Sequence, residues 1–491
     1  MTITRIAPSP TGSLHIGGIR TALFSFALAR HSQGKFLLRI EDTDQNRFVK
    51  GAEEEIEEML KIYGLIYDDK YKQTERKEIY QKYAKELVVS GKAYYCFATK
   101  EQIQEARDIA ELAGEQFRFR SPFREMTLDE SQKRIESGEQ YVVRLKVPET
   151  REINFEDKLQ GKMTFRSDEV DDTILLKSDG LPTYHLAVVV DDHLMGVTNV
   201  LRGVEWIPSV PKHVLIYEAF GWEQPDFIHL PLILDPDGGK LSKRKGSVSA
   251  KDFISQGYLP EAVINFLMLL GWSSPIKHEF GEKEREIFTL DEFIEMFDVK
   301  DLNKSSAVFN REKLLWFNHQ YIMNLSIEEL QRRYGEWHAK FSVEKELRLK
   351  VAQKGDKYLK SVLELVHDRV KLLSEIDGLV TLFYFEPEKI NFTDFKQVRN
   401  LNEDQISIIL KSVVMELKKK SENLEDWSHE IWEEFMRKLA EENDLGAGKV
   451  FMTLRLAITS SPTTPPLYEI MTVLGKAEIL TRLSKYVDNI K

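Results

Sequence analysis

The sequence predicts an α/β protein whose parallel sheet is interrupted by an inserted segment and followed by an all-helical region. Three observations support this fold class. Short apolar strands alternate with amphipathic helices in the first third of the sequence. This alternation stops near residue 96 and resumes near residue 182. After about residue 311 the sequence pattern is almost wholly helical. With 491 residues the chain is also too long for one ordinary domain, and roughly three domains of about 150 residues are expected.

The first third reads as two strand–helix pairs. The expected elements are a strand at Ile3–Ala7, a loop at Pro8-Ser9-Pro10, a helix from Ile16 to about His31 with Gly34 as its C-cap, a strand at Phe36–Ile40 and a helix at Gly51–Tyr63. A β-α-β-α order predicts parallel strands joined by crossover helices. Ligands bind such sheets beyond the carboxyl ends of the strands.

The middle of the chain divides the sheet into two halves. Within residues 96–181 we expect a charge-rich helix at Glu101–Ala113 and short strands at Tyr141–Val147 and Thr173–Leu176. The βα pattern then returns as strands at Leu186–Val190 and Asn199–Arg202, a helix at Val210–Phe220 and a strand at Phe227–Leu234. We therefore expect one domain made of residues 1–95 and 182–235, with residues 96–181 inserted into it.

Two further regions follow. Residues 236–315 form the next expected domain, and residues 316–491 are expected to be helical, with a division into two subdomains near residue 375 left open. The expected helices include Leu359–Leu373, Glu403–Lys420, Glu430–Glu441 and Gly475–Tyr486.

Composition excludes several classes of protein. With 42% hydrophobic residues the chain can build real cores, and its longest apolar run, Ala262–Trp272, is too short to span a bilayer. The first residues lack a signal peptide or transit peptide pattern, and Cys96, the only cysteine, can form neither an internal disulfide nor a cysteine-based zinc cluster. We expect a cytoplasmic protein without membrane contact. The net charge of −11 leaves a nucleic-acid partner open, because binding depends on local patches.

The first motif with chemical meaning joins the first strand to the first helix. It reads Ala7-Pro-Ser-Pro-Thr-Gly-Ser-Leu-His-Ile-Gly-Gly18. The N-terminus of a helix offers unpaired N–H groups and a positive dipole end to a phosphate, Gly17 and Gly18 allow a close approach, and His15 can donate a hydrogen bond. A simple turn with a capping Ser or Thr is the alternative for a shorter string of this kind.

The second motif is a basic, glycine-rich loop at Asp237–Gly246, directly after a predicted strand. Four cations fall within six residues, at Lys240, Lys243, Arg244 and Lys245. Taken alone, such a loop is most often solvated surface. Together with the first motif it suggests a clamp for an anion such as a triphosphate.

These strings resemble the two signatures of class I aminoacyl-tRNA synthetases, HIGH (here HIGG, His15–Gly18) and KMSKS (here KLSKR, Lys240–Arg244). The surrounding sequence is similar to that of bacterial-type glutamyl-tRNA synthetases. The matching strings are PSPTG, Arg39–Asp44, Asp179–His185, Asp191-Asp192-His193 and Leu201-Arg202-Gly203. The similarity covers some 240 residues in the right order. It implies a Rossmann-type catalytic domain with an inserted acceptor-end domain at 96–181, a stem-contact domain carrying the KMSKS loop at 236–315, and a helical anticodon-binding region.

The glutamate site that the resemblance implies has chemical needs that residues of this sequence can meet. Glutamate carries two carboxylates, which call for arginine, and one ammonium, which calls for a carboxylate and a hydroxyl. Arg5, Arg202 and Glu41 end predicted parallel strands and Ser9 follows one, so all four should converge at one edge of the sheet. Salt bridges at the sheet edge are the alternative for the two arginines, and a core position is the alternative for Tyr184.

The resemblance assigns a role to each matching position. Contacts to the ATP phosphates fall to His15, Gly17, Gly18, Lys240, Ser242, Lys243 and Arg244, and the rest of the HIGH region is Ser9, Pro10, Thr11, Gly12, Ser13, Leu14, Ile16 and Ile19. Glutamate contacts fall to Arg5, Ala7, Ser9, Glu41, Tyr184, Val188 and Arg202, and adenosine contacts to Glu205, Trp206 and Ile233. Arg369 and Arg455 are candidates for tRNA contact.

The implied activity is that of a glutamate–tRNA ligase using ATP with Mg²⁺, with L-glutamate and tRNA(Glu) as partners and a monomeric state. A form that also charges tRNA(Gln) is the nearest alternative. A nucleotidyltransferase without tRNA and an inactive tRNA-binding scaffold are the other classes. Some relatives hold zinc in the inserted domain through a C-x-C string, but here the second cysteine is replaced by Ala98, so no protein-bound zinc and no other metal site is expected.

Overall fold

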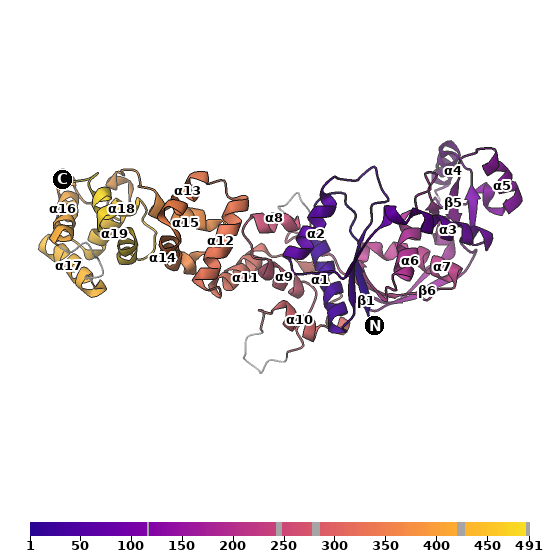
Figure 1. Cartoon of the computed structure of the whole chain (residues 1–491), viewed down its shortest axis with the longest axis horizontal. Helices are drawn as coiled ribbons and strands as arrows, with labels where there is room; N and C mark the ends of the chain where they lie inside the picture. Colours follow the sequence, from indigo (N-terminus) through magenta and orange to yellow (C-terminus); the bar gives the residue numbers. More distant parts are fainter. Residues whose placement is uncertain (115–116, 242–247, 277–284, 420–427, 488–491) are drawn as a thin grey trace. The chain divides into compact units, whose positions relative to one another are not determined.

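The computed structural model describes residues 1–114, 117–241, 248–276, 285–419 and 428–487. The chain divides into two compact units (Figure 1). The first unit consists of Met1–Ile254 and Pro260–Phe317, and the second of Ser255–Leu259 and Asn318–Lys491. The predicted fold class is confirmed, since parallel strands with covering helices build the first unit and helices build the second.

Two groups of strands form the main sheet of the first unit. One group has the order β1-β2-β3 and the other β7-β6-β10-β9. All neighbours are parallel except β6 and β7. The strands are β1 (Ile3–Ile6), β2 (Lys35–Ile40), β3 (Asp69–Lys72), β6 (Glu152–Asp157), β7 (Gly161–Arg166), β9 (Asn199–Gly203) and β10 (Asp226–Leu230). The two groups meet between β1 and β9, where the backbone N–H of Thr198 donates to the carbonyl of Ile3 at 2.9 Å.

Helices cover this sheet because their apolar residues face it. They are α1 (Ile16–His31), α2 (Ala52–Ile62), α3 (Lys77–Val89), α6 (Tyr184–Leu194) and α7 (Val210–Phe220). Tyr80, Leu186 and Val214 from three of these helices share one core with Phe227 of β10. Both α1 and α7 have the bounds that the sequence predicted.

The prediction of a strand at Leu186–Val190 is wrong, because these residues lie in helix α6. The run Leu-Ala-Val-Val-Val is buried on every side, so it lacks the polar face that marks a helix by its period of 3.6 residues. The predicted strand Phe227–Leu234 is divided at Pro231 into β10 and the short β11 (Ile233–Leu234), which pairs with β12 (Ala307–Val308).

The segment predicted as an insertion contains a second, antiparallel sheet. Its order is β4-β5-β8, from Ala93–Cys96, Val142–Leu145 and Ile174–Leu176, which confirms the strands expected near Tyr141 and Thr173. Helices α4 (Lys100–Leu112) and α5 (Leu128–Glu136) flank it (Figure 1). Strand β6 of the same segment hydrogen-bonds to β10, and β7 pairs with β6, so both strands extend the main sheet. The domain boundaries at 96 and 181 stay predictions.

The rest of the described chain is helical. The helices are α8 (Ala250–Ser255), α9 (Pro260–Leu269), α10 (Leu290–Met296), α11 (Arg311–Met323), α12 (Ile327–Phe341), α13 (Lys345–Lys354), α14 (Asp356–Val366), α15 (Glu375–Tyr384), α16 (Glu403–Lys419), α17 (His429–Glu442), α18 (Ala447–Thr459) and α19 (Leu467–Leu483). Gly475, at φ 79°, bends α19 within its length. Among the described residues, no helix has the length and apolar character that crossing a membrane requires.

Candidate active site

A cleft of about 630 Å³ opens at the carboxyl ends of β1, β2 and β9. Its walls come from the β1–α1 loop, the start of α6, and the short 3₁₀ helix Val204–Ser209 that follows β9. The predicted site residues that line it are Arg5, Ala7, Ser9, Thr11, Gly12, Ser13, Leu14, His15, Gly17, Gly18, Glu41, Tyr184, Arg202, Glu205, Trp206, Ile233 and Lys240. The structure therefore brings most of the predicted residues into one cleft.

Helix α1 points its N-terminus into this cleft, and His15 caps it. The backbone N–H of Gly17 donates to His15 Nδ1 at 3.0 Å, so a neutral His15 carries its hydrogen on Nε2. A Cβ atom at Gly18 would meet Leu14 Cδ1 at 3.0 Å, which accounts for a glycine there. The helix N-terminus and an imidazole N–H are both suited to phosphate oxygens.

The described residues on both sides of 242–247 contact residues that line the cleft. On one side of residues 242–247, the N–H of Leu241 donates to the carbonyl of Ile233 at 3.0 Å. On the other side, the N–H of Ala250 donates to the carbonyl of Leu14 at 2.8 Å. Lys240 forms an ion pair with Glu205 at 3.1 Å. The described ends of the two motifs thus lie in one site, whereas Ser242, Lys243 and Arg244 fall outside the described residues.

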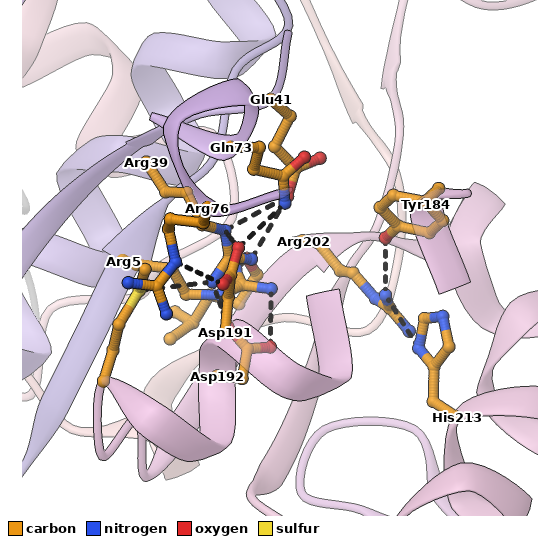
Figure 2. A network of polar contacts seen from close by, with 12 residues as sticks. Arg5, Arg39, Glu41, Gln73, Arg76, Tyr184, Asp191, Asp192, Arg202 and His213 are labelled. Atoms are coloured by element: carbon orange, nitrogen blue, oxygen red, sulfur yellow. Dashed lines mark hydrogen bonds and ion pairs between the residues drawn. The ribbon is translucent and has the colours of Figure 1, made fainter. Parts of the chain in front are cut away.

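Arg5 belongs to a buried ion-pair network at the end of β1 (Figure 2). Its Nε donates to Asp192 Oδ1 at 3.1 Å, and Arg39 Nη1 donates to the same oxygen at 2.6 Å. Arg39 also holds Glu41, with Nη2 and Oε1 3.1 Å apart. Burial raises the pKa of the Glu41 carboxyl against the opposing effect of Arg39. Burial would also raise the pKa of Asp192, but Arg39 and Arg5 outweigh it and lower the pKa.

Asp191 extends the network beneath the cleft. Arg76 Nε donates to its Oδ1 at 2.9 Å, while Gln73 Nε2 and the Tyr80 hydroxyl donate to Oδ2 at 3.0 and 2.8 Å. Arg39 Nε lies 3.8 Å from Oδ2. Neighbouring carboxylates at the end of α6 thus organise side chains from β1, β2 and α3. The two carboxylates and Glu41 face three guanidiniums, those of Arg5, Arg39 and Arg76, so the network is balanced in formal charge.

Arg202 differs from these arginines because the side chains that accept its hydrogen bonds are all neutral. Its Nε donates to His229 Nε2 at 2.9 Å. Its Nη1 donates to the Tyr184 hydroxyl at 2.9 Å and lies 3.5 Å from His213 Nδ1 (Figure 2). Its Nη2 is buried, and no hydrogen-bond acceptor for it exists among the residues that the structure describes. The side chain is 6% exposed and lines the cleft. A buried, uncompensated cation therefore faces the cleft.

The histidines around Arg202 are held neutral. Burial, and after it the charge of Arg202, lowers the pKa of His213 well below its usual range. Burial and Lys212 lower the pKa of His185 to about 4, and the His185 and His213 rings contact each other through Nδ1 and Nε2 at 3.2 Å. Burial also lowers the pKa of His229. The neutral rings of His229 and His213 therefore contact Arg202 without forming an ion pair with it.

Another part of the cleft wall carries aromatic and apolar side chains. Trp206 lies against Tyr184 with ring centroids 4.6 Å apart, and Ile233 completes this side. Arg20 of α1 also lines the cleft, where it donates to the carbonyls of Leu270, at 2.9 Å, and Pro231. Its burial lowers the pKa of its guanidinium to about 10. An apolar slot beside a phosphate-binding helix end is suited to a nucleotide.

Comparison with known proteins agrees with this geometry. Residues 1–316 match the family described as tRNA synthetases class I (E and Q), catalytic domain, and residues 329–487 match an anticodon binding domain. A glutamate–tRNA ligase of Chloroherpeton thalassium is 40% identical over 99% of this chain and 98% of its own length, and one of Finegoldia magna is 39% identical over 98% of both. The chain belongs to the glutamate–tRNA ligase family.

Solved structures of this family have the same fold. A crystal structure of a glutamate tRNA ligase from Elizabethkingia meningosepticum CCUG26117, in complex with its amino acid, superposes with a TM-score of 0.85 at 35% identity over the whole of both chains. Glutamate-tRNA synthetase from Elizabethkingia anophelis gives 0.83 at 34% identity over 99% of both chains. The predicted resemblance to glutamyl-tRNA synthetases is therefore confirmed.

Some positions that the family resemblance suggested lie away from the cleft. Ile16 and Ile19 are fully buried in the core side of α1, and Pro10 is buried in the loop before it. Val188, predicted to contact glutamate, is 2% exposed in α6 and packs in the core of the first unit. It does not line the cleft. The helical path of α6, which differs from the predicted strand, gives Val188 this core position.

Arg369 and Arg455, the predicted tRNA contacts, lie in the second unit within the matched anticodon domain. Arg455 donates to the carbonyl of Pro465 at 2.8 Å and to Thr464, and so supports the proline-rich turn after α18. Its pKa is lowered by burial and by the nearby charge of Arg369. Arg455 therefore has a structural partner of its own.

Several residues that shape the site were not assigned a role from the sequence. They are Arg20, Arg39, Asp157, Asp191, Asp192, His213 and His229. The adjacent pair Asp191-Asp192 carried a usable signal, because two acidic residues directly after an apolar run indicate buried ion pairs. Asp157 and His229 carried none, since Asp157 stands among other charged residues at the end of a strand and His229 is a single polar residue within one.

The expected absence of zinc stays a prediction. Within the described ranges, no group of three or more His, Cys, Asp or Glu side chains is placed to hold a metal ion. Cys96 is buried, and its thiol contacts the Ser121 hydroxyl at 3.2 Å. Nearby, Asp172 accepts hydrogen bonds from the Tyr94 hydroxyl at 3.0 Å and from Arg124 Nη1 at 2.6 Å. Ordinary hydrogen bonds and ion pairs thus hold this segment together.

Proposed function

We propose that the protein is a glutamate–tRNA ligase, which activates L-glutamate with ATP and then transfers the glutamyl group to the 3′-terminal adenosine of tRNA(Glu). The observation that carries this proposal is Arg202, a buried guanidinium in the cleft whose side-chain acceptors are all neutral. Such a group needs an anionic ligand, because an unpaired buried charge is strongly unfavourable. Family membership makes the ligand an amino acid.

The charge of the cleft favours glutamate over glutamine. The carboxylates of Glu41, Asp191 and Asp192 are paired with the guanidiniums of Arg5, Arg39 and Arg76, whereas the side chains that accept directly from Arg202 are neutral. L-glutamate carries a net charge of −1 near neutral pH and glutamine carries none. Binding glutamine would leave the guanidinium of Arg202 unpaired, which costs far more than losing a contact between neutral groups.

We assign the two carboxylates of glutamate to Arg5 and Arg202, and its ammonium group to Glu41 and Ser9. Both hydrogen bonds from Arg39 end on Oε1 of Glu41, and in the described part of the chain none ends on Oε2. That oxygen is therefore suited to an ammonium. Ala7 and Tyr184 line the same part of the cleft. Val188 is left out of this assignment because of its core position.

ATP would occupy the other half of the cleft. His15 with the N–H groups of α1 is suited to the triphosphate, Trp206 and Ile233 to the adenosine, and Lys240 stands at the edge of the basic loop. Lys243 is expected to act on the leaving pyrophosphate. Mg²⁺ would arrive bound to ATP, since it is usually held by phosphates and water and does not require a dedicated protein site.

The chemistry requires positioning and charge stabilisation and little proton transfer. An oxygen of the α-carboxylate attacks the α-phosphorus, the bond to the β-phosphate bridging oxygen breaks, and pyrophosphate leaves with those electrons. A ribose hydroxyl of the tRNA then attacks the acyl carbon and loses its proton, and AMP leaves. Donors fixed in advance along α1 would stabilise the charge on the phosphorus oxygens in the first step.

The decisive experiment attaches labelled glutamate, with ATP and Mg²⁺, to purified tRNA(Glu) and tRNA(Gln) separately. We expect charging of tRNA(Glu). Charging of tRNA(Gln) as well would assign the protein to the dual-specificity form, and charging of neither by folded protein would overturn the proposal. Labelled glutamine serves as the matched control and should not be attached. A cytoplasmic location and a monomeric state remain predictions that accompany this function.

A further inference from the structure

Arg202 and His229 are directly paired residues on two neighbouring parallel strands, β9 and β10. Paired residues in a sheet point their side chains to the same face, so the imidazole lies alongside the guanidinium. Arg202 Nε donates to His229 Nε2 at 2.9 Å. Because a guanidinium nitrogen can only donate, Nε2 carries no hydrogen, and the hydrogen of the neutral ring sits on Nδ1.

Asp157, the last residue of β6, contacts the Nδ1 side of the His229 ring and so holds the hydrogen on that nitrogen. Its Oδ2 accepts from His229 Nδ1 at 2.6 Å, and the two side chains are 1% and 0% exposed. Its Oδ1 accepts from the backbone N–H groups of Leu159 and Gln160 at 2.9 and 2.7 Å, which closes the β6–β7 turn. The carboxylate can therefore only accept, which determines the tautomer of the ring.

The same turn also holds the backbone of His229. Its N–H donates to Asp157 Oδ2 at 3.1 Å, and Gln160 Nε2 donates to its carbonyl at 2.9 Å. The turn thus contacts His229 at the ring, the N–H and the carbonyl. A histidine in a strand needs none of these contacts to pair with its neighbour. Their joint presence indicates that the position of the ring matters.

We propose that Asp157 and His229 are positioning residues that orient Arg202 for the amino-acid substrate while leaving its positive charge uncompensated. This inference rests on the proposed function of Arg202 as a carboxylate ligand. A carboxylate placed directly on Arg202 would orient it equally well, but it would cancel the charge that selects glutamate. The imidazole separates the two roles, because it accepts the hydrogen bond as a neutral group and passes the constraint to Asp157.

The test measures steady-state kinetics of ATP–pyrophosphate exchange or tRNA charging for a set of variants. His229→Leu removes the acceptor, whereas His229→Gln retains an oxygen that can accept from Arg202. Asp157→Asn is the sharpest change. Its amide would place N–H groups opposite His229 Nδ1, so the ring would have to move its hydrogen to Nε2 and oppose the Nε–H of Arg202. The reverse amide orientation would oppose the N–H groups of Leu159 and Gln160.

Thr4→Val is the matched control. Thr4 is fully buried in β1, and its hydroxyl donates to the carbonyl of Ser25 at 2.7 Å, so the change removes a buried hydrogen bond without contacting Arg202. We expect His229→Leu and Asp157→Asn to raise KM for glutamate about tenfold or more, as loss of a hydrogen bond to a charged group does. KM for ATP should stay within about twofold, and His229→Gln should recover most of the loss.

Arg202→Gln separates the two claims. If it raises KM for glutamate and His229→Leu does not, the positioning role is overturned and the proposed function stands. An unchanged KM in Arg202→Gln would overturn the assignment of Arg202 itself. A parallel rise of both KM values in the His229 and Asp157 variants, matched by Thr4→Val, would reduce the effect to general destabilisation and also overturn the proposal.

A second measurement needs no destabilising variant. In protein labelled with ¹⁵N-histidine, the His229 signals, assigned by their loss in His229→Gln, should show a protonated Nδ1 and an unprotonated Nε2. A hydrogen on Nε2, or an imidazolium, near neutral pH would overturn the proposal. Glutamate binding should leave this tautomer unchanged, since Arg202 remains a donor to His229 when it holds a carboxylate.

Discussion

At the scale of single residues, the arginines of the cleft differ in how their charges are balanced. Arg5 shares Asp192 with Arg39, whereas Arg202 has neutral acceptors only. The sequence predicted both Arg5 and Arg202, because each ends a parallel strand. It could not predict which of the two keeps an uncompensated charge. That difference depends on partners far away in the chain, such as Asp192, which is 187 positions from Arg5.

A stability prediction belongs to His185. Burial and Lys212 lower its pKa to about 4, against the influence of Asp171, while the pKa in the unfolded chain is about 6.5. Between these values the unfolded chain binds a proton that the folded protein does not. The free energy of unfolding should therefore fall as the pH falls from about 6.5 to about 4, by on the order of 2–3 kcal/mol for this residue.

Urea denaturation at a series of pH values measures this effect. His213 and His229 have lowered pKa values too and contribute with the same sign, so part of the loss should persist in any single variant. His185→Gln should lose less stability than the unchanged protein between pH 7 and 4.5. Equal losses in the two proteins would contradict the assignment. Above about pH 7 the two curves should run parallel, because neither state then binds this proton.

At the scale of elements, helix length and residue type separate the helix that the sequence predicted from the one that it missed. Helix α1 has the predicted bounds Ile16–His31 although residues 22–27 are all buried, because its length and its many alanine and leucine residues favour a helix. Helix α6 was misassigned because its β-branched residues are buried all round and its only charged residues stand at its end. Burial by neighbouring elements, which periodicity cannot show, decided the outcome.

Gly34 shows how tightly one strand is held. A Cβ atom there would lie 1.8 Å from the carbonyl oxygen of Thr2, the residue directly before β1. Gly34→Ala should therefore displace β1 from β2, destabilise the first unit by about 1–3 kcal/mol, and raise KM for glutamate because Arg5 lies in β1. Urea midpoints and steady-state kinetics measure both effects.

Gly335→Ala provides the control for that substitution. Gly335 lies in α12, and nothing lies within 4 Å of the position that a Cβ atom would take there, so alanine should stabilise the helix by about 0.5–1 kcal/mol. KM for glutamate should not change. A Gly34→Ala variant with unaltered stability would show that β1 can shift without cost, and the close approach would then have no role in placing Arg5.

At the scale of the whole molecule, the net charge of −11 taken by itself argues against a nucleic-acid partner, yet the chain belongs to a tRNA ligase family. Net charge sums over both units and hides local patches. Motif order was the better guide, because all the family strings stand in register over the catalytic half. The chain of contacts from Asp157 through His229 to Arg202 depends on which strands are neighbours in the sheet. It could not be predicted from the sequence.

Each unit has buried side chains of its own, so we expect thermal unfolding to show two calorimetric transitions in place of one. Asp377 marks the second unit. It accepts hydrogen bonds from Tyr334, His338 and Ser342 at 2.7, 2.8 and 2.6 Å, which tie α15 to α12 and to the residue that follows α12. Asp377→Ala leaves buried donors unpaired and should lower one transition by an amount equivalent to about 2–4 kcal/mol.

ATP with glutamate should raise the other transition. A ligand that binds only the folded state stabilises it by about 2.7 kcal/mol at a hundred times its Kd, and the cleft belongs wholly to the first unit. In Arg202→Gln the shift with glutamate should shrink, while the shift with ATP alone should remain. If the ligands instead raised the transition that Asp377→Ala lowers, the two transitions could not be assigned to the two units, and the binding site would have to be sought outside the cleft.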